Sequence, residues 1–404
     1  MDVEEIKKIS TELGFPCVIP LVKALRNTKD LSPTDVYSVL YEDDEDGGHS
    51  FLLESAELGE KIARYSFLGR DPEKIITVKE GTKNPMEDLR SLISRYNVHQ
   101  GKLPKFFGGL LGYFSYDVVR YFEDIGDLAK DELKQKDAQF MFVKDLVVFD
   151  HWRDEILLIS NLTLDEEGQI EREYTKAMEK IARMEGLIKG AEKQRPSFQK
   201  DSRPVEAKSN FKKEDFESAV AEAKEHIFAG DIFQVVLSQR FKVEGGFDPF
   251  NVYLALKEIN PSPYMYLLDF GTTKIIGSSP EILVKVDDGT VTVRPIAGTR
   301  PRGDDIVEDE SLSREMVNDE KERAEHVMLV DLGRNDVGKI SRFGSVEVTE
   351  FFGIEKYSHV QHIISNVEGR LREDVDSFDA LEAAFPAGTV TGAPKVRAMQ
   401  IIEE

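Results

Sequence analysis

Short apolar runs separated by turn residues dominate the first half of the chain. The runs at 51–53, 75–78 and 155–159 are bounded by Gly, Asp or Pro, which predicts three short β-strands. A fourth strand is predicted at 108–113, where three glycines would let another backbone approach closely. We therefore expect a strand-rich first half with a few helices.

The second half begins with apolar residues at helical spacing, and Gly230 is expected to end that helix. The residues at this spacing are Phe216, Ala219, Val220, Ala223, Ile227 and Phe228. Five strand-like runs follow, the first of them predicted to be buried, at 232–237, 264–270, 273–277, 282–286 and 290–294. A charged helix is predicted at 314–332, with Gly333 as its stop.

Two more helices are predicted near the end of the chain. One spans 377–385 with Ser377 as its N-cap, and the last begins with Pro394 at its first position. Strand runs and helix runs are separated without steady βαβ alternation, so the predicted fold class is α+β rather than doubly wound α/β.

The segment 186–213 has few large apolar residues, two prolines and many charges, which is typical of an exposed linker. We therefore predict an N-terminal region at 1–190, a linker at 191–210 and a second region at 211–404.

Composition narrows the class of protein. A chain of 404 residues can bury a sizeable core, and its net charge of −23 disfavours binding to nucleic acid or to an anionic membrane surface. The acidic N-terminus does not resemble a secretory signal, and no apolar run is long enough to span a membrane. The single cysteine, Cys17, cannot form an internal disulfide and is expected to pack in a core, so a cytoplasmic protein is expected.

Paired carboxylates are the first candidate for chemistry. Glu322 and Glu325 are three residues apart and would share one face of a helix, where they could hold a hard cation such as Mg²⁺. The alternative is a solvated charged helix. The apolar run 327–332 that follows would place Glu325 at the buried end of this helix.

A glycine- and threonine-rich loop at 388–395 is the second candidate. It leads into a helix and ends in Lys395, so its backbone N–H groups could cradle an anion. The glycine spacing is not that of a Walker A loop, so a carboxylate fits as well as a phosphate. A tight helix-entry turn remains the alternative.

Three further segments are weak signals by themselves. His359 and His362 could bind a metal, although a structural role is the simpler interpretation. Arg300 and Arg302 follow a predicted strand and could bind a carboxylate bidentately. Glu281 lies in a turn at a strand end.

Taken together, ordered motifs resemble a known family. The chain contains FAGDIFQVVLSQRF, NPSPYMYLLDFG, GSSPEIL, RPIAGTRPRG, DEKERAEHVMLVDLGRNDVGKI, YSHVQHI and FPAGTVTGAPKVRAM, in this order. They are similar to segments of the chorismate-utilising enzymes, most closely the anthranilate synthase component I family. The resemblance covers nearly all of 205–404 and extends to FLLESAELGEKIARYSFLG at 51–69.

The resemblance implies a fold and a set of site residues. The fold would be two packed, mostly antiparallel β-sheets flanked by helices. The implied roles are catalysis for Glu281, His362 and Gln234; Mg²⁺ binding for Glu325 and Glu322; substrate binding for Ala297, Gly298, Thr299, Thr389 and Lys395; and tryptophan binding for Leu53, Glu54, Ser55, Pro263, Tyr264 and Met265.

Two positions distinguish the subfamilies that the resemblance brings in. Isochorismate and salicylate synthases carry a Lys where this chain has Gln234, and an amide cannot deprotonate water. Aminodeoxychorismate synthases commonly carry a Lys where this chain has Ala297. Both differences favour anthranilate synthesis, with aminodeoxychorismate synthase component I and a non-catalytic tryptophan-binding regulatory subunit as the alternatives.

The implied reaction adds ammonia at C2 of chorismate, while a protonated Glu281 assists departure of the C4 hydroxyl. That role requires burial to raise the pKa of Glu281. Mg²⁺ would hold the ring carboxylate, pyruvate would be eliminated, and tryptophan would inhibit. The sequence has no glutaminase constellation, so a separate glutamine amidotransferase subunit is the implied ammonia source.

Family members continue past the helix at 394–404, into a part that supplies a second Mg²⁺ carboxylate and two substrate anchors. We therefore expect the chain to be truncated, and inactive and prone to aggregation when made alone. Val396, Met399 and Ile402 are expected to lose part of their burial.

Overall fold

A computed structural model describes residues 1–26, 30–42, 48–55, 64–78, 84–191, 205–357 and 359–404. The chain forms two compact units that are interleaved in the sequence. The first consists of residues 1–115, 136–200 and 247–280, and the second of residues 116–135, 201–246 and 281–404. The predicted regions 1–190 and 211–404 remain predictions, and most of the predicted linker at 191–210 lies outside the described residues.

The first unit is built on an eight-stranded sheet with strand order β14-β13-β2-β3-β8-β9-β1-β5. Every neighbouring pair is antiparallel except β1 with β5. The strands are β1 (Cys17–Arg26), β2 (Ser50–Glu54), β3 (Tyr65–Arg70), β5 (Asn97–Val98), β8 (Asp145–Asp150), β9 (Glu155–Leu164), β13 (Tyr264–Asp269) and β14 (Lys274–Ser279). A smaller antiparallel sheet contains β4 (Lys74–Thr77), β6 (Gly109–Phe114) and β7 (Ala138–Val143).

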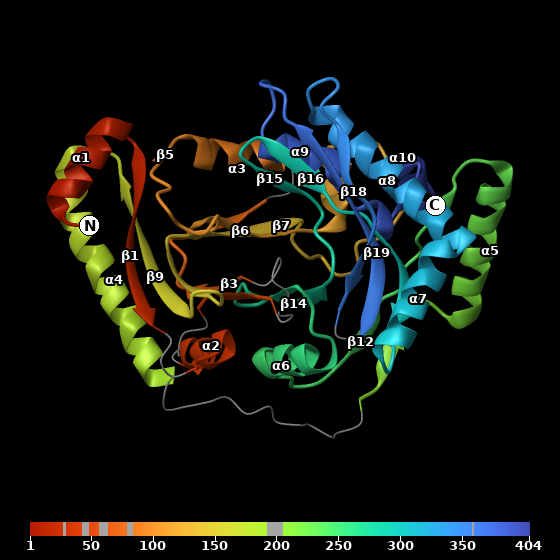
Figure 1. Cartoon of the computed structure of the whole chain (residues 1–404), viewed down its shortest axis with the longest axis horizontal. Helices are drawn as coiled ribbons and strands as arrows, with labels where there is room; N and C mark the ends of the chain where they lie inside the picture. The colour runs from red at the N-terminus through yellow and green to blue at the C-terminus, as the bar shows by residue number, and fades with distance from the viewer. Residues whose placement is uncertain (27–29, 43–47, 56–63, 79–83, 192–204, 358) are drawn as a thin grey trace. The chain divides into compact units, whose positions relative to one another are not determined.

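Two apolar cores hold this unit together. In one, the large sheet packs with residues of α1 (Val3–Leu13), α2 (Pro33–Glu42), α4 (Ile170–Ala191) and α6 (Pro249–Ile259). Helices α2 and α6 lie side by side, and the rings of Tyr37 and Phe250 are 5.2 Å apart (Figure 1). In the other, the large sheet packs with residues of the small sheet. The unit also contains α3 (Pro85–Ser94).

The second unit is built on a five-stranded antiparallel sheet whose central strand is β19. Its strands are β15 (Lys285–Asp287), β16 (Thr290–Val293), β17 (Ile296–Pro301), β18 (Glu347–Lys356) and β19 (Val360–Arg370). The long helix α8 (Glu320–Ile340) and α9 (Ser377–Ala384) pack apolar residues against this sheet. The remaining helices are α5 (Lys213–Ala229), α7 (Ile306–Asn318) and α10 (Lys395–Glu403).

Two short ribbons complete the second unit. One pairs β10 (Ala207–Ser209) with β12 (Phe241–Val243), and the other pairs β11 (Gln234–Val235) with β20 (Gly392–Ala393). The fold is therefore α+β with mostly antiparallel sheets flanked by helices, as predicted. Within the described residues, no helix is long and apolar enough to cross a membrane.

Most predicted strands are confirmed, including the close approach at 108–113. A Cβ added at Gly112 would lie 2.0 Å from the carbonyl oxygen of Gln139 on the paired strand β7. The strand expected at 282–286 is shorter and begins later, at Lys285. The buried strand expected at 232–237 is wrong: only Gln234 and Val235 are paired, and Phe233 is 76% exposed.

The charged helix expected at 314–332 is also wrong in its bounds. Asp319 ends α7 and caps α8, because its side chain accepts from the amides of Lys321 and Glu322. The helix continues through Gly333, where the absence of a side chain lets it pack closely. A Cβ added there would lie 3.0 Å from Cγ2 of Val293.

Helix ends differ from the predictions by small shifts. Asp376, not Ser377, caps α9 through a capping box with Asp379. Pro394 occupies the N-cap position of α10 rather than its first turn. Helix α5 ends at Gly230 in the left-handed conformation as predicted, but its apolar stripe is not a core face, since Phe228 is 81% exposed.

The last helix packs better than expected. Met399 is buried and joins a cluster with Val119 and Ile125, to which Val396 adds. The expected partial loss of burial is therefore wrong for Met399, which packs against residues of the segment 116–135 in the same unit, whereas Val396 and Ile402 are only partly buried.

Candidate active site

The strands β17 and β19 bring three predicted site residues together. Their register shifts between Ala297 and Arg300, and this irregularity displaces Gly298 and Thr299 from regular pairing. Nδ1 of His362, on β19, donates to the Gly298 carbonyl at 2.8 Å and lies 3.1 Å from Oγ1 of Thr299. A neutral His362 ring with its proton on Nδ1 carries its lone pair on Nε2, as a proton-transfer role requires.

Gly298 is required at this position by its backbone. Its φ of +67° lies in the left-handed region, and a Cβ there would lie 3.3 Å from Oε2 of Glu322. The carboxylate of Glu322 therefore approaches the same bulge as His362.

Arg300 holds the Glu322 carboxylate from the other side. Nη1 of Arg300 donates to Oε1 of Glu322 at 3.1 Å, while its Nε donates to Glu315 at 3.0 Å. Arg300 is thus committed to protein carboxylates, and the expectation that it would bind a substrate carboxylate is not supported by its contacts.

Glu325 lines an open groove of about 880 Å³ together with Gln234. Oε1 of Gln234 is buried and has no hydrogen-bond partner among the described residues. Glu325 itself is half-buried rather than at a buried end of the helix. Among the described residues, no group of three or more His, Cys, Asp or Glu could hold a metal ion.

The residue of this helix that enters the core is His326. Its side chain is fully buried, and Nε2 lies 2.7 Å from Oγ of Ser365. Burial lowers the pKa of His326 to about 4, so the ring is neutral at physiological pH. The sequence places a charged run here and gives no sign that its one imidazole points inward.

Glu281 and Thr389 meet although they are 108 residues apart in the chain. Oγ1 of Thr389 donates to Oε2 of Glu281 at 3.1 Å, and both residues line a cavity of about 40 Å³ with Arg294 and Asp336. Burial raises the pKa of Glu281 to about 7, against the opposing effect of the Thr389 hydrogen bond. The expected upward shift of this pKa is confirmed.

Lys395 does not have the surroundings expected of a substrate ligand. Its Nζ is buried and donates to Oδ2 of Asp336 at 2.8 Å and to the Ala384 carbonyl at 2.7 Å. The loop before it also uses several of its own amides, such as those of Val390 and Thr391. In these contacts the segment is a tight helix entry, which was the alternative to an anion cradle.

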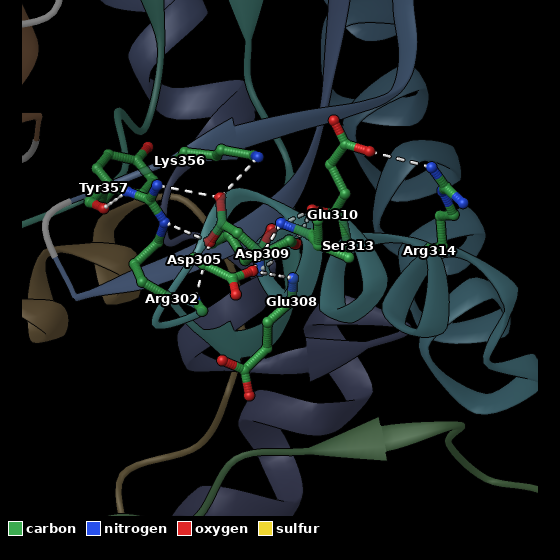
Figure 2. A network of polar contacts seen from close by, with 12 residues as sticks. Arg302, Asp305, Glu308, Asp309, Glu310, Ser313, Arg314, Lys356 and Tyr357 are labelled. Atoms are coloured by element: carbon green, nitrogen blue, oxygen red, sulfur yellow. Dashed lines mark hydrogen bonds and ion pairs between the residues drawn. The ribbon is translucent and has the colours of Figure 1, made fainter.

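Arg302 is likewise engaged inside the protein (Figure 2). It donates to both carboxylate oxygens of Asp309, at 2.8 and 3.1 Å, and to the Tyr357 carbonyl at 2.6 Å. Lys356 also donates to Asp309, at 2.7 Å. Hydrogen bonds from Arg302 and Lys356 hold the pKa of Asp309 well below its usual range.

This network ties the end of β17 to β18 and α7, beside the His362 bulge. The rings of Tyr357 and His362 have centroids 5.5 Å apart. His362 is thus fixed by the Gly298 carbonyl and an aromatic neighbour, whereas His359 is exposed. The structure does not bring these two histidines into a metal site.

The predicted tryptophan segments lie on adjacent strands of the first unit. Glu54 pairs with Met265, and Leu53 pairs with Tyr266, the residue after the predicted segment Pro263–Met265. Oγ of Ser55 is buried with no hydrogen-bond partner in the described part of the chain.

Glu54 is anchored rather than open. It accepts hydrogen bonds from Tyr253 at 2.9 Å and from Nζ of Lys257 at 2.7 Å, both on α6. Pro263 and Met265 are buried, whereas Tyr264 is exposed. A tryptophan site at these residues remains a prediction.

Residues that sequence reasoning missed share one property. Arg294, Asp336 and Tyr357 lie within the motifs that carry the family resemblance, but no local pattern gave them a role. Arg294 and Asp336 line the Glu281 cavity, and the ring of Tyr357 lies beside that of His362. Asp336 falls in a charged helix that resembles a solvated face, yet its side chain is buried.

Known proteins match this chain over most of its length. The family model described as chorismate binding enzyme matches residues 48–404. The anthranilate synthase component 1 of Acetivibrio thermocellus is 47% identical over 380 residues, which cover 89% of this chain and 76% of that protein. The chloroplastic anthranilate synthase alpha subunit 1 of Arabidopsis thaliana is 38% identical over 435 residues, covering 100% of this chain and 73% of that protein.

Solved structures agree with the fold. The crystal structure of anthranilate synthase component I from Streptococcus pneumoniae matches with a TM-score of 0.73 and 36% identity, covering 86% of this chain and 78% of that chain. The menaquinone-specific isochorismate synthase of Escherichia coli matches with a TM-score of 0.70 at 14% identity, covering 99% of this chain and 83% of that one, which shows the shared fold alone. This chain therefore belongs to the family of chorismate-binding enzymes, in which anthranilate synthase component 1 proteins are its relatives.

Proposed function

We propose that this protein is an anthranilate synthase large subunit, a lyase that converts chorismate and ammonia to anthranilate and pyruvate in the first committed step of tryptophan biosynthesis. The observation that carries the chemistry is the Glu281 carboxyl, which is half-buried, hydrogen-bonded to Thr389 and has a pKa raised to about 7. A carboxyl group of this pKa is available as an acid near neutral pH.

In this proposal Glu281 donates a proton to the departing C4 hydroxyl of chorismate. His362 transfers a proton at the ring through Nε2, since its Nδ1 is held by the Gly298 carbonyl. Thr299 and the backbone of Ala297 and Gly298 contact the ring-bound carboxylate. Thr389 orients Glu281 as well as contacting substrate.

Gln234 and Ala297 favour ammonia as the nucleophile. Gln234 has no basic group to activate water, and Ala297 has no amine to attack the ring. Neutral ammonia needs neither. Gln234 lines the groove, and its Oε1 has no hydrogen-bond partner among the described residues, so it could accept from the N–H donors of an incoming ammonia after a side-chain rotation.

Mg²⁺ fits the groove through Glu325. Glu325 lines the same open groove as Gln234, and Mg²⁺ commonly takes one or two protein carboxylates and leaves positions for substrate. Bound there, Mg²⁺ would act as a Lewis acid on the C1 carboxylate. Glu322 is held by Arg300 and would act behind Glu325.

The relatives' designation as component 1 supports a partner subunit. We propose a glutamine amidotransferase as that partner and free tryptophan as the effector, bound at Leu53–Ser55 and Pro263–Met265. Paired strands place these two segments next to each other, which supports a single site.

The decisive experiment supplies the full chain with chorismate, Mg²⁺ and excess ammonium salt near neutral pH and monitors anthranilate fluorescence. Anthranilate formation with ammonia, and with glutamine only after an amidotransferase subunit is added, is the expected result. A 4-amino product would identify an aminodeoxychorismate synthase instead. Tryptophan binding without any turnover would identify a non-catalytic regulatory subunit and overturn the proposal.

A further inference from the structure

One ammonium group holds both ends of the loop that carries Thr389. Nζ of Lys395, the first residue of α10, donates to the carbonyl of Ala384, the last residue of α9, at 2.7 Å. It also donates to Oδ2 of Asp336 on α8 at 2.8 Å, and both charged side chains are 9% exposed. We call these three groups the Lys395 clasp.

The clasp spans the loop from 385 to 394, whose two ends it joins. Because Ala384 precedes this loop and Lys395 follows it, their hydrogen bond fixes the separation of the loop ends. The ion pair with Asp336 fixes both ends to α8, the helix that also carries Glu325.

Two candidate site residues depend on this loop. Thr389 reaches Glu281 from its middle, at 3.1 Å. Farther along, the carbonyls of Thr391 and Ala393 accept from the amides of Val236 and Phe233, at 2.8 and 2.7 Å. Those two amides flank Gln234, whose strand pairs with β20.

We propose that Lys395 and Asp336 are positioning residues: the Lys395 clasp holds the 385–394 loop so that Thr389 meets Glu281 and Gln234 faces the groove. The expected changes in kcat rest on the proposed function, whereas the expected change in the position of the 385–394 loop does not. It replaces the expected contact between Lys395 and substrate.

Charge burial makes the clasp testable by paired substitutions. Removing one member of a buried ion pair leaves the other uncompensated, whereas removing both charges together avoids that penalty. If Lys395 and Asp336 act as one unit, their effects are therefore non-additive. A Lys395 that contacts substrate would instead act independently of Asp336.

The kinetic test uses the full chain with chorismate, Mg²⁺ and ammonium salt. We expect Lys395→Met and Asp336→Asn each to lower kcat by about 100-fold, since small misplacements of catalytic groups cost that much. The double variant should be no slower than the slower single variant. The matched control is Lys339→Met, because the Lys339 side chain is 53% exposed and its Nζ lies 3.6 Å from the same Asp336 carboxylate. The kcat of this variant should stay within about twofold of the parent value.

The pH profile separates loop displacement from direct electrostatics. Arg294, which pairs with Glu355 at 2.8 Å, and Asp336 are the charged groups that line the Glu281 cavity. Loss of the Thr389 hydrogen bond raises the pKa of Glu281, so the alkaline limb of kcat should move to higher pH in both single variants and in Thr389→Val. Direct electrostatics would move it in opposite directions, because Lys395→Met removes a positive charge and Asp336→Asn a negative one.

Amide hydrogen exchange tests the clasp without any turnover. In Lys395→Met and Asp336→Asn, the amides of Phe233 and Val236 should exchange at least about tenfold faster, while those of the β18–β19 pairing stay protected. Unchanged exchange at both amides would overturn the proposal. So would a raised KM for chorismate in Lys395→Met alone, with Asp336→Asn unaffected. Faster exchange in a chain that makes no anthranilate would reject the proposed function and keep the clasp.

If either single variant fails to fold, the apolar pair Asp336→Leu with Lys395→Met tests the same point, since a well-packed apolar pair often replaces a buried ion pair without loss of stability. The clasp predicts faster exchange at Phe233 and Val236 in this variant too, because the hydrogen bond to Ala384 is lost.

Discussion

At the scale of single residues, the carboxylates of the site differ in whether a basic side chain is bound to them. Glu322 is committed to Arg300, Asp309 to Arg302 and Lys356, and Asp336 to Lys395. Glu325 and Glu281 differ, because one lines an open groove and the other has a pKa raised by burial. This difference supports the proposed metal role of Glu325 and the proposed acid role of Glu281.

Glu281→Gln is expected to lower kcat by about 10²- to 10⁴-fold, the usual contribution of a general acid. In the parent protein kcat should fall as pH rises through about 7, when Glu281 loses its proton. The measurement is a pH profile of anthranilate formation at constant free ammonia. If Glu281→Gln kept the same fall in kcat at alkaline pH, a titratable group other than Glu281 would be responsible for that fall.

The same pKa has a consequence for stability. Because the folded-state pKa of Glu281 lies above its unfolded value, the native state binds the extra proton, and stability is lost as pH rises from about 4.5 to 7. The loss attributable to this one carboxyl is roughly 3 kcal/mol. Urea unfolding at both pH values should show a smaller pH dependence in Glu281→Gln by about that amount.

Glu325→Gln is expected to abolish turnover and Mg²⁺ binding while leaving stability within about 0.5 kcal/mol, because the side chain is only half-buried. Isothermal titration with Mg²⁺ and urea unfolding check the two parts separately. Asp331→Asn is the matched control, since Asp331 lines the same groove from the same helix but pairs with Arg334. Full activity of Glu325→Gln at limiting Mg²⁺ would show that Glu325 does not bind the metal.

At the scale of elements, α8 organises the second unit. Its N-terminal half carries Glu322 and Glu325, while its C-terminal half packs on the sheet and anchors the Lys395 clasp. The helix can approach β16 closely because Gly333 faces Val293, where a Cβ would lie 3.0 Å from Cγ2. A residue that normally ends helices therefore permits this one to pack.

Gly333→Val should destabilise the protein by about 1–3 kcal/mol, the usual cost of overpacking a core. The matched control is Gly338→Ala on the same helix, where a Cβ would meet nothing within 4 Å. That change should stabilise by up to about 1 kcal/mol through helix propensity. Thermal and urea unfolding measure the stability of both variants and of the parent. If Gly333→Val were as stable as the parent, α8 would not pack closely at Gly333.

At the scale of the whole molecule, the chain divides into two units with separate assignments. The proposed catalytic residues belong to the second unit, and the proposed tryptophan residues belong to the first. Regulation therefore needs two distinct sites with a coupling free energy, typically about 1–3 kcal/mol.

Ser55→Phe is expected to abolish inhibition by tryptophan without loss of basal activity, because a bulky ring at this position would occupy the proposed effector site. A loss of coupling would raise the inhibitory concentration of tryptophan by about 5- to 150-fold. Inhibition assays and tryptophan titrations on Ser55→Phe and Ser55→Ala provide the test. Sensitivity equal to that of the parent in Ser55→Phe would place the effector elsewhere.

The sequence by itself determined the class of fold, most strands, the family and the identity of the chemical groups. These follow from short-range periodicity and from residue types in ordered motifs, which need no knowledge of distant contacts. Even the raised pKa of Glu281 was predictable once its acid role was inferred, and burial is its cause.

Only the tertiary structure decided which charged residues serve chemistry and which serve packing. Lys395, Arg300 and Arg302 all resemble anion ligands in the sequence, yet each is bound to a carboxylate of the protein. The partners of Lys395 and Arg300 are 59 and 22 residues away, and Arg302 joins the nearby Asp309 to the distant Tyr357 carbonyl. Gly333 resembles a helix stop until Val293 is placed against it. Charge pairing and close packing are pairwise effects between distant residues, so a local pattern shows that a group is present but not which partner it finds.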